Sequence, residues 1–125
     1  MIYLSAPYTS TDELLREWRV RRCVMVMAEL MAANKLVVCP AVMNHEAVST
    51  LFARSADPGR VYWQALEERL ATACDKLFVL RLPGWDESRG VRREIALFTE
   101  LGRPITFVER AAGDDEEMPD EGRAS

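Results

Sequence analysis

Two glutamates, Glu67 and Glu94, are candidates for chemistry because each falls on the apolar side of a predicted helix. At about 100° per residue, Glu94 projects into the same arc as the apolar residues of a helix predicted over 88–101. Glu67 does the same within a helix predicted over 61–74. A buried carboxylate is costly unless it is paired, hydrogen-bonded or neutralised. Each acid therefore either pairs with an arginine at the edge of its stripe or lies in a cleft as an acid, base or nucleophile. The presence of two such acids favours the cleft.

The residues just before Glu94 are typical of a helix start that faces a ligand. Asp86 or Ser88 can cap the helix, and Gly90 in the first turn lets a ligand approach the backbone amides. The free N–H groups of a helix N-terminus attract phosphate and other anions. Trp85 either stacks on a ligand ring or covers the core. The stretch is neither a P-loop nor a GxGxxG sequence.

Strands and helices alternate along the chain. Apolar runs predict strands over residues 2–6, 36–39, 76–80 and 104–108. Helical spacing predicts a long helix that is capped by Thr11 or Asp12 and ends near Ala33, and further helices over residues 43–53, 61–74 and 88–101. Each strand is a continuous apolar run, which is typical of a parallel sheet with helices on both faces. The sequence therefore predicts a small α/β fold built on an open parallel sheet.

The carboxyl ends of the strands are the expected ligand-binding edge of such a sheet. In this chain that edge consists of residues 6–8, 40–45 and 82–88. Tyr8 and His45 thereby become candidate ligand contacts. A surface or loop-packing role fits His45 equally well.

The net charge of −4 at pH 7 comes from the C-terminal segment. Residues 109–125 carry a net charge of −5, whereas the preceding part carries +1. The segment is acidic and has no aromatic residue, so we expect a domain over 1–108 followed by a disordered tail over 109–125. The nearly neutral body gives little support to nucleic-acid binding. In the first helix, Arg16, Arg19 and Arg22 either hold a phosphate or form a solvated face or a subunit contact.

The composition gives no support to a membrane protein, a disulfide-bonded protein or a metalloprotein. No apolar run approaches the roughly 18 residues that a membrane helix needs, so no membrane contact is expected. Cys23, Cys39 and Cys74 form no CxxC pair, which indicates reduced thiols and a cytoplasmic location. His45 has no Cys or His partner at ligand spacing, so no metal site is predicted, and no cofactor is predicted either.

Three stretches resemble the nucleoside 2-deoxyribosyltransferase-like superfamily, in particular a bacterial and phage branch with a PGWDxSxGV motif. They are "IYLSAPY" at the start, "CDKLFVLRLPGWDESRGVRREIA" in the middle and "ELGRPITFV" at the end. The resemblance covers residues 1–108. It implies a flavodoxin-like fold and a homodimer or higher homo-oligomer in which a neighbouring chain helps to close the site.

The resemblance also implies roles for individual residues. In the superfamily, the Glu after Ser-x-Gly attacks C1′ of a ribosyl or deoxyribosyl group, and Glu94 matches it. The acid that assists departure of the base is usually Asp, and Glu67 stands at that position. Ser88 matches the residue that contacts the 5′-phosphate in nucleotide-hydrolysing members. The other expected substrate contacts are Tyr8, His45, Trp85, Asp86 and Gly90.

We therefore expect an enzyme that cleaves or transfers the N-glycosidic bond of a nucleoside or nucleotide. Glu67 would be protonated because it is buried, and would donate its proton to the leaving base. By analogy with retaining glycosidases, the two carboxyl groups would lie about 5–5.5 Å apart. The alternative is a non-catalytic nucleotide-binding or sensor protein on the same fold.

Overall fold

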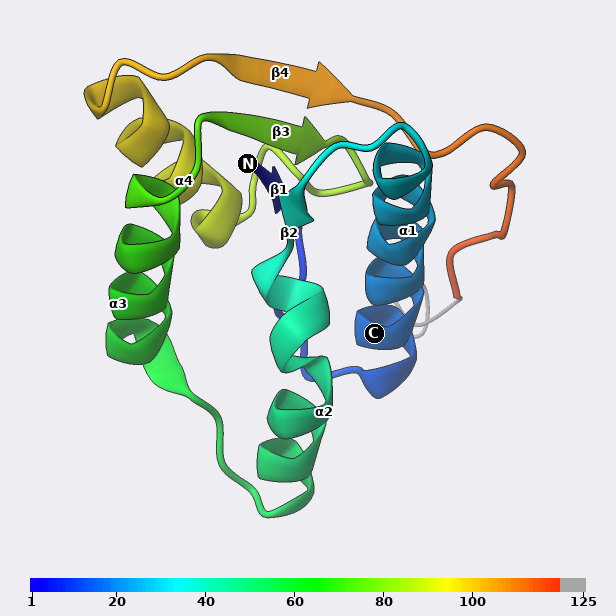
Figure 1. The fold of residues 1–125 in the computed structure, drawn as a ribbon. Coiled ribbons are helices and arrows are strands. Elements are labelled where there is room, and N and C mark those ends of the chain that lie inside the picture. Colours follow the sequence, from blue (N-terminus) through cyan, green and yellow to red (C-terminus); the bar gives the residue numbers. More distant parts are fainter. Residues whose placement is uncertain (120–125) are drawn as a thin grey trace.

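The computed structural model describes residues 1–119 as an alternation of strands and helices (Figure 1). The strands are β1 (Ile2–Ser5), β2 (Val37–Val38), β3 (Lys76–Leu80) and β4 (Ile105–Val108). The helices are α1 (Glu13–Ala32), α2 (Pro40–Ala53), α3 (Gly59–Thr72) and α4 (Arg89–Glu100). All strand pairs are parallel, in the order β2-β1-β3-β4. The predicted α/β fold with an open parallel sheet is confirmed, and it is consistent with a flavodoxin-like arrangement.

Helices cover both faces of the sheet, with α1 and α2 on one side and α3 and α4 on the other (Figure 1). Successive side chains of a strand point to opposite faces. Leu4 accordingly packs with Trp18 and other residues of α1, whereas Tyr3 packs with Phe98 of α4. Ser5, two residues after Tyr3, points to the same side as Tyr3 and so towards α4.

The predicted helix ends agree with the structure where a specific cap is present. The Asp12 carboxylate accepts the Leu15 N–H at 2.9 Å, and Ser88 caps α4 by accepting the Val91 N–H at 3.3 Å. Gly102 follows α4 with a φ of 68°, the left-handed conformation that glycine adopts at little cost.

The region around Pro40 differs from the prediction. The helix predicted over 43–53 begins earlier, at Pro40, and β2 is shorter than the predicted strand over 36–39. Proline suits the first turn of a helix, because its ring fixes φ and its missing N–H needs no partner there. Pro40 therefore starts a helix where the sequence interpretation placed only the end of a strand.

The acidic segment after β4 contacts α1 over the residues that the structure describes. Arg22 of α1 donates from Nε to Asp114 at 2.7 Å and pairs with Glu116 at 3.1 Å. The Trp18 indole N–H donates to the Glu116 carbonyl at 3.0 Å. These contacts hold the segment around Asp114 and Glu116 against α1. The remainder of the predicted tail, residues 120–125, lies outside the described residues.

Within residues 1–119, none of the helices has the length and apolar character that crossing a membrane requires.

Candidate functional site

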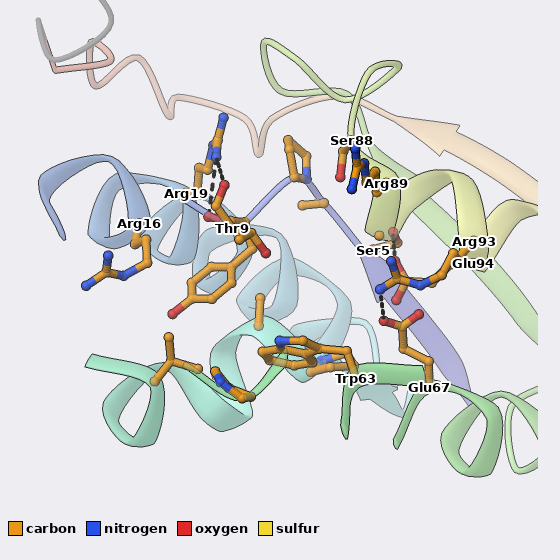
Figure 2. Close-up of a pocket in the computed structure, with 18 of the residues that line it drawn as sticks. Ser5, Thr9, Arg16, Arg19, Trp63, Glu67, Ser88, Arg89, Arg93 and Glu94 are labelled. Atoms are coloured by element: carbon orange, nitrogen blue, oxygen red, sulfur yellow. Dashed lines mark hydrogen bonds and ion pairs between the residues drawn. The ribbon is translucent and has the colours of Figure 1, made fainter. Parts of the chain in front are cut away.

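A cavity of about 570 Å³ opens at the carboxyl ends of β1 and β3, where the sequence places the ligand-binding edge (Figure 2). Its walls include Tyr8 and Thr9 after β1, Arg16 and Arg19 of α1, Phe52 of α2, Trp63 and Glu67 of α3, and Ser88, Gly90, Arg93 and Glu94 around the start of α4. Small-molecule sites typically enclose about 300–1,000 Å³. The cavity is therefore large enough for a mononucleotide.

Glu94 lies in the wall of the cavity with only 7% of its surface exposed. The Ser5 hydroxyl donates to Glu94 Oε1 at 2.6 Å. Burial, together with the negative charge of Glu67, raises the pKa of Glu94 to about 8, although the Ser5 hydrogen bond acts in the opposite direction. The Tyr3 hydroxyl faces the same carboxyl, in a geometry that falls short of a regular hydrogen bond. At neutral pH Glu94 therefore keeps its proton.

Glu67 is equally buried, at 6% exposure, but it has a cationic partner. Arg93 Nη2 lies 2.8 Å from Glu67 Oε1 in an ion pair. Figure 2 shows Ser5, Glu67, Arg93 and Glu94 together on one side of the cavity. Of the two interpretations drawn from the sequence, pairing with an arginine applies to Glu67, and burial in a cleft applies to both acids.

The sequence analysis made Glu67 the protonated acid, and in the structure Glu94 is the carboxyl whose pKa is raised. The ion pair with Arg93 stabilises a negative charge on Glu67. That charge makes a second one on Glu94 more costly, so the proton resides on Glu94. One ionised and one protonated carboxyl in the same cavity is an arrangement suited to acid–base chemistry.

The structure brings three of the six predicted substrate contacts to the cavity. Tyr8, Ser88 and Gly90 all belong to its lining. Apart from the backbone of α4 itself, the atoms nearest to the position that a Cβ on Gly90 would take are Arg93 Nη2 at 3.8 Å and the Ser88 hydroxyl at 3.9 Å. The first turn of α4 therefore presents open backbone to the cavity.

The other three predicted contacts are not among the lining residues. Trp85 packs against Phe107 of β4, with ring centroids 5.4 Å apart, and so covers the core. The Asp86 carbonyl accepts Arg92 Nε at 2.8 Å. His45 Nδ1 shares a hydrogen bond of 2.8 Å with the Tyr8 hydroxyl, so this imidazole contacts the site only through Tyr8.

Ser5 and Arg93 are functional candidates that the sequence analysis missed. Ser5 is a polar residue at the end of an otherwise apolar strand, which is a recognisable signal for a site at the carboxyl edge of a sheet. Arg93 projects away from the apolar stripe of α4, yet its long side chain reaches Glu67 on α3. Only the packing of α3 beside α4 reveals that pair.

We expect the variant Ser5→Ala to raise the pKa of Glu94 above its value of about 8. The hydroxyl stabilises the ionised form of this carboxyl, and alanine removes the donor without filling the cavity. Titration of the Glu94 carboxyl carbon by NMR measures the change. Ser49→Ala is the control, because the Ser49 hydroxyl has no hydrogen-bond partner among residues 1–119. A pKa that stays constant or falls would show that the hydrogen bond does not act on the ionised carboxylate.

Residues of the described part offer no evident metal site, because no three His, Cys, Asp or Glu side chains among residues 1–119 gather as ligands.

Comparisons with known proteins identify a family for the chain. No curated protein gives a significant match. The family model described as a domain of unknown function (DUF1937) matches residues 1–110. This span contains the whole sheet and all the residues that line the cavity. The protein is therefore a member of the DUF1937 domain family.

Proposed function

We propose that this protein cleaves or transfers the N-glycosidic bond of a nucleoside or nucleotide, with Glu94 as the nucleophile and Glu67 as the acid–base group. The observation that carries the proposal is the pair of buried carboxyl groups in one cavity, one ionised against Arg93 and the other protonated. The resemblance of "GWDESRGVRRE" and its flanking strands to the nucleoside 2-deoxyribosyltransferase-like superfamily supports the same chemistry.

Glu94 must lose its proton before its carboxylate can attack C1′. The Glu67 carboxylate is the neighbouring base, and taking up this proton makes Glu67 the acid that the leaving base requires. The C1′–N bond then breaks with its electron pair going to the base nitrogen, which receives the proton from Glu67. A bond forms between the Glu94 oxygen and C1′.

The second half of the reaction restores both carboxyl groups. Water or a second base attacks C1′, displaces the Glu94 carboxylate and gives its proton to Glu67. Glu67 then returns the proton to Glu94, which restores the resting state. The positive charge that develops on the sugar ring is stabilised by the ionised Glu94 beside it. Arg93 holds Glu67 in place throughout and balances its charge when the proton has left.

A non-catalytic nucleotide-binding protein is the second candidate. The feature that favours it is the resting state of the site, in which Glu94 is protonated and Glu67 is engaged by Arg93. The cytoplasmic location and the homo-oligomer expected from the sequence stay predictions for either function.

Incubation with a panel of nucleosides, nucleoside monophosphates and NAD, followed by chromatography of released base, tests the proposal. We expect wild type to release base from at least one compound, and Glu94→Gln to release it at least about 10³-fold more slowly because the nucleophile is absent. Glu100→Gln, an exposed acid on the same helix, is the matched control and should retain wild-type rates. Tight binding without release by wild type would favour the binding protein instead.

A further inference from the structure

Two arginines of α1 are almost completely buried, and they differ in their partners. Arg22, at 3% exposure, lies 2.7 Å from Asp114 and 3.1 Å from Glu116. Arg16, at 2% exposure, donates from Nη1 to the Ser10 carbonyl at 2.8 Å. Among residues 1–119 Arg16 forms no ion pair with an acid, and its Nε has no hydrogen-bond partner.

The guanidinium of an arginine carries a positive charge in proteins, also where it is buried. The ring of Phe52, whose centroid lies 4.3 Å from the Arg16 guanidinium carbon, supplies some stabilisation. One carbonyl, one ring and the hydroxyl of Tyr8, which also interacts with Arg16, do not replace the water that burial removes from five N–H donors. Arg16 is therefore left with unused capacity to bind an anion.

Tyr8, the neighbouring hydroxyl, does not supply that negative charge. Burial raises the pKa of Tyr8 to about 12, even though the Arg16 charge lowers it, so the phenol is neutral at physiological pH. The Tyr8 hydroxyl is also engaged with His45 Nδ1 at 2.8 Å. Although Asp57 also belongs to the cavity lining, no acid among residues 1–119 forms an ion pair with Arg16.

Arg16 belongs to the lining of the cavity that contains Glu67 and Glu94. Figure 2 shows Arg16 on the α1 side, the two glutamates on the opposite side, and Trp63 between them in that view. A ligand with its reacting bond at the glutamates would therefore extend another part towards Arg16.

We propose that Arg16 binds an anionic group, a phosphate or a carboxylate, on the ligand that fills this cavity. If the proposed function holds, on which this substrate class rests, the substrate is a negatively charged N-glycoside rather than a neutral nucleoside. The site for the anion itself does not depend on that reaction.

Thermal unfolding of the full chain in inorganic phosphate and in acetate, with sodium chloride holding the ionic strength constant, tests the proposal without any turnover. The variants are Arg16→Met, which removes the unpaired charge but keeps a long apolar side chain, and Arg22→Met as the matched control on the same helix. We expect one of the two anions to stabilise wild type and Arg22→Met, and to bind Arg16→Met at least about tenfold more weakly. A preference for phosphate identifies a phosphorylated ligand, and a preference for acetate identifies a carboxylate.

The unfolding temperatures without anion add a second readout. Arg16→Met should be at least as stable as wild type, because it removes an uncompensated charge. Arg22→Met should be less stable, because it removes the closer of the two arginine partners of the buried Asp114 carboxylate and leaves only Arg110 at 3.3 Å. The proposal is overturned if Arg16→Met keeps the full anion response or if neither anion stabilises wild type. An anion response that depends on Arg16, in a protein that releases no base, would uphold this site and reject the proposed function.

Discussion

Glu94→Gln is expected to be more stable than wild type by about 4 kcal/mol near pH 8, and within about 1 kcal/mol of it near pH 5. The folded protein raises the pKa of Glu94 from 4.5 to about 8. A raised folded-state pKa contributes stability that is fully present below pH 4.5 and is lost as the pH rises through 8. Glutamine keeps the shape of the side chain and its acceptor for the Ser5 hydroxyl, but it never has to carry a buried charge.

Urea unfolding of both proteins at the two pH values measures this difference. Glu100→Gln serves as the control, because its side chain is exposed and its substitution should change stability little at either pH. A Glu94→Gln protein that is less stable than wild type near pH 8, or one whose difference is the same at both pH values, would mean that Glu94 does not titrate as a buried acid. Glu94→Gln is thus expected to gain stability and lose activity. Such a trade-off is common at functional sites, which often reduce the stability of the folded protein.

The second large effect is expected from Glu67→Gln, which should slow base release from nucleosides by about 10²–10⁴-fold. The substitution removes the group that takes the proton from Glu94 and passes it to the leaving base. A nitrophenyl riboside, whose leaving group departs without a proton, should lose much less activity. The same substitution removes the negative charge that raises the pKa of Glu94, so the ionisation of Glu94 should move to lower pH.

Rates with both substrates as a function of pH test these expectations. Glu68→Gln, an exposed acid next to Glu67 on α3, is the matched control and should behave as wild type. Equal losses on the two substrates would assign Glu67 a structural role through Arg93 instead of proton transfer. Unchanged rates would remove Glu67 from the mechanism.

Much of the fold could be predicted because its signals are local. Asp12 and Ser88 act as caps through hydrogen bonds to residues three positions ahead, and the apolar runs correspond to the four parallel strands. The inward projection of Glu67 and Glu94 also depends only on helical spacing, and both side chains are buried.

The features that could not be predicted depend on residues far apart in the sequence. The ion pair of Arg93 with Glu67 exists because α3 packs beside α4, and the charge of Glu67 adds to the burial that raises the pKa of Glu94. Trp85 turns to the core because β4 places Phe107 next to it. The segment around Asp114 is ordered because Arg22 is available 92 residues earlier in the chain. Neither the composition nor the hydrophobic periodicity of the sequence reveals which residues form these long-range contacts.

The most direct test of the central claim is the intact mass of the protein after incubation with a 2′-fluoro analogue of the nucleoside or nucleotide that the panel identifies as a substrate. Fluorine at C2′ slows hydrolysis of a sugar–enzyme ester by destabilising the positively charged transition state. We expect a mass increase equal to one fluorinated sugar group, located by peptide mapping on Glu94 and absent from Glu94→Gln. Base release by wild type without any adduct, together with retained release by Glu94→Gln, would show that Glu94 is not the nucleophile.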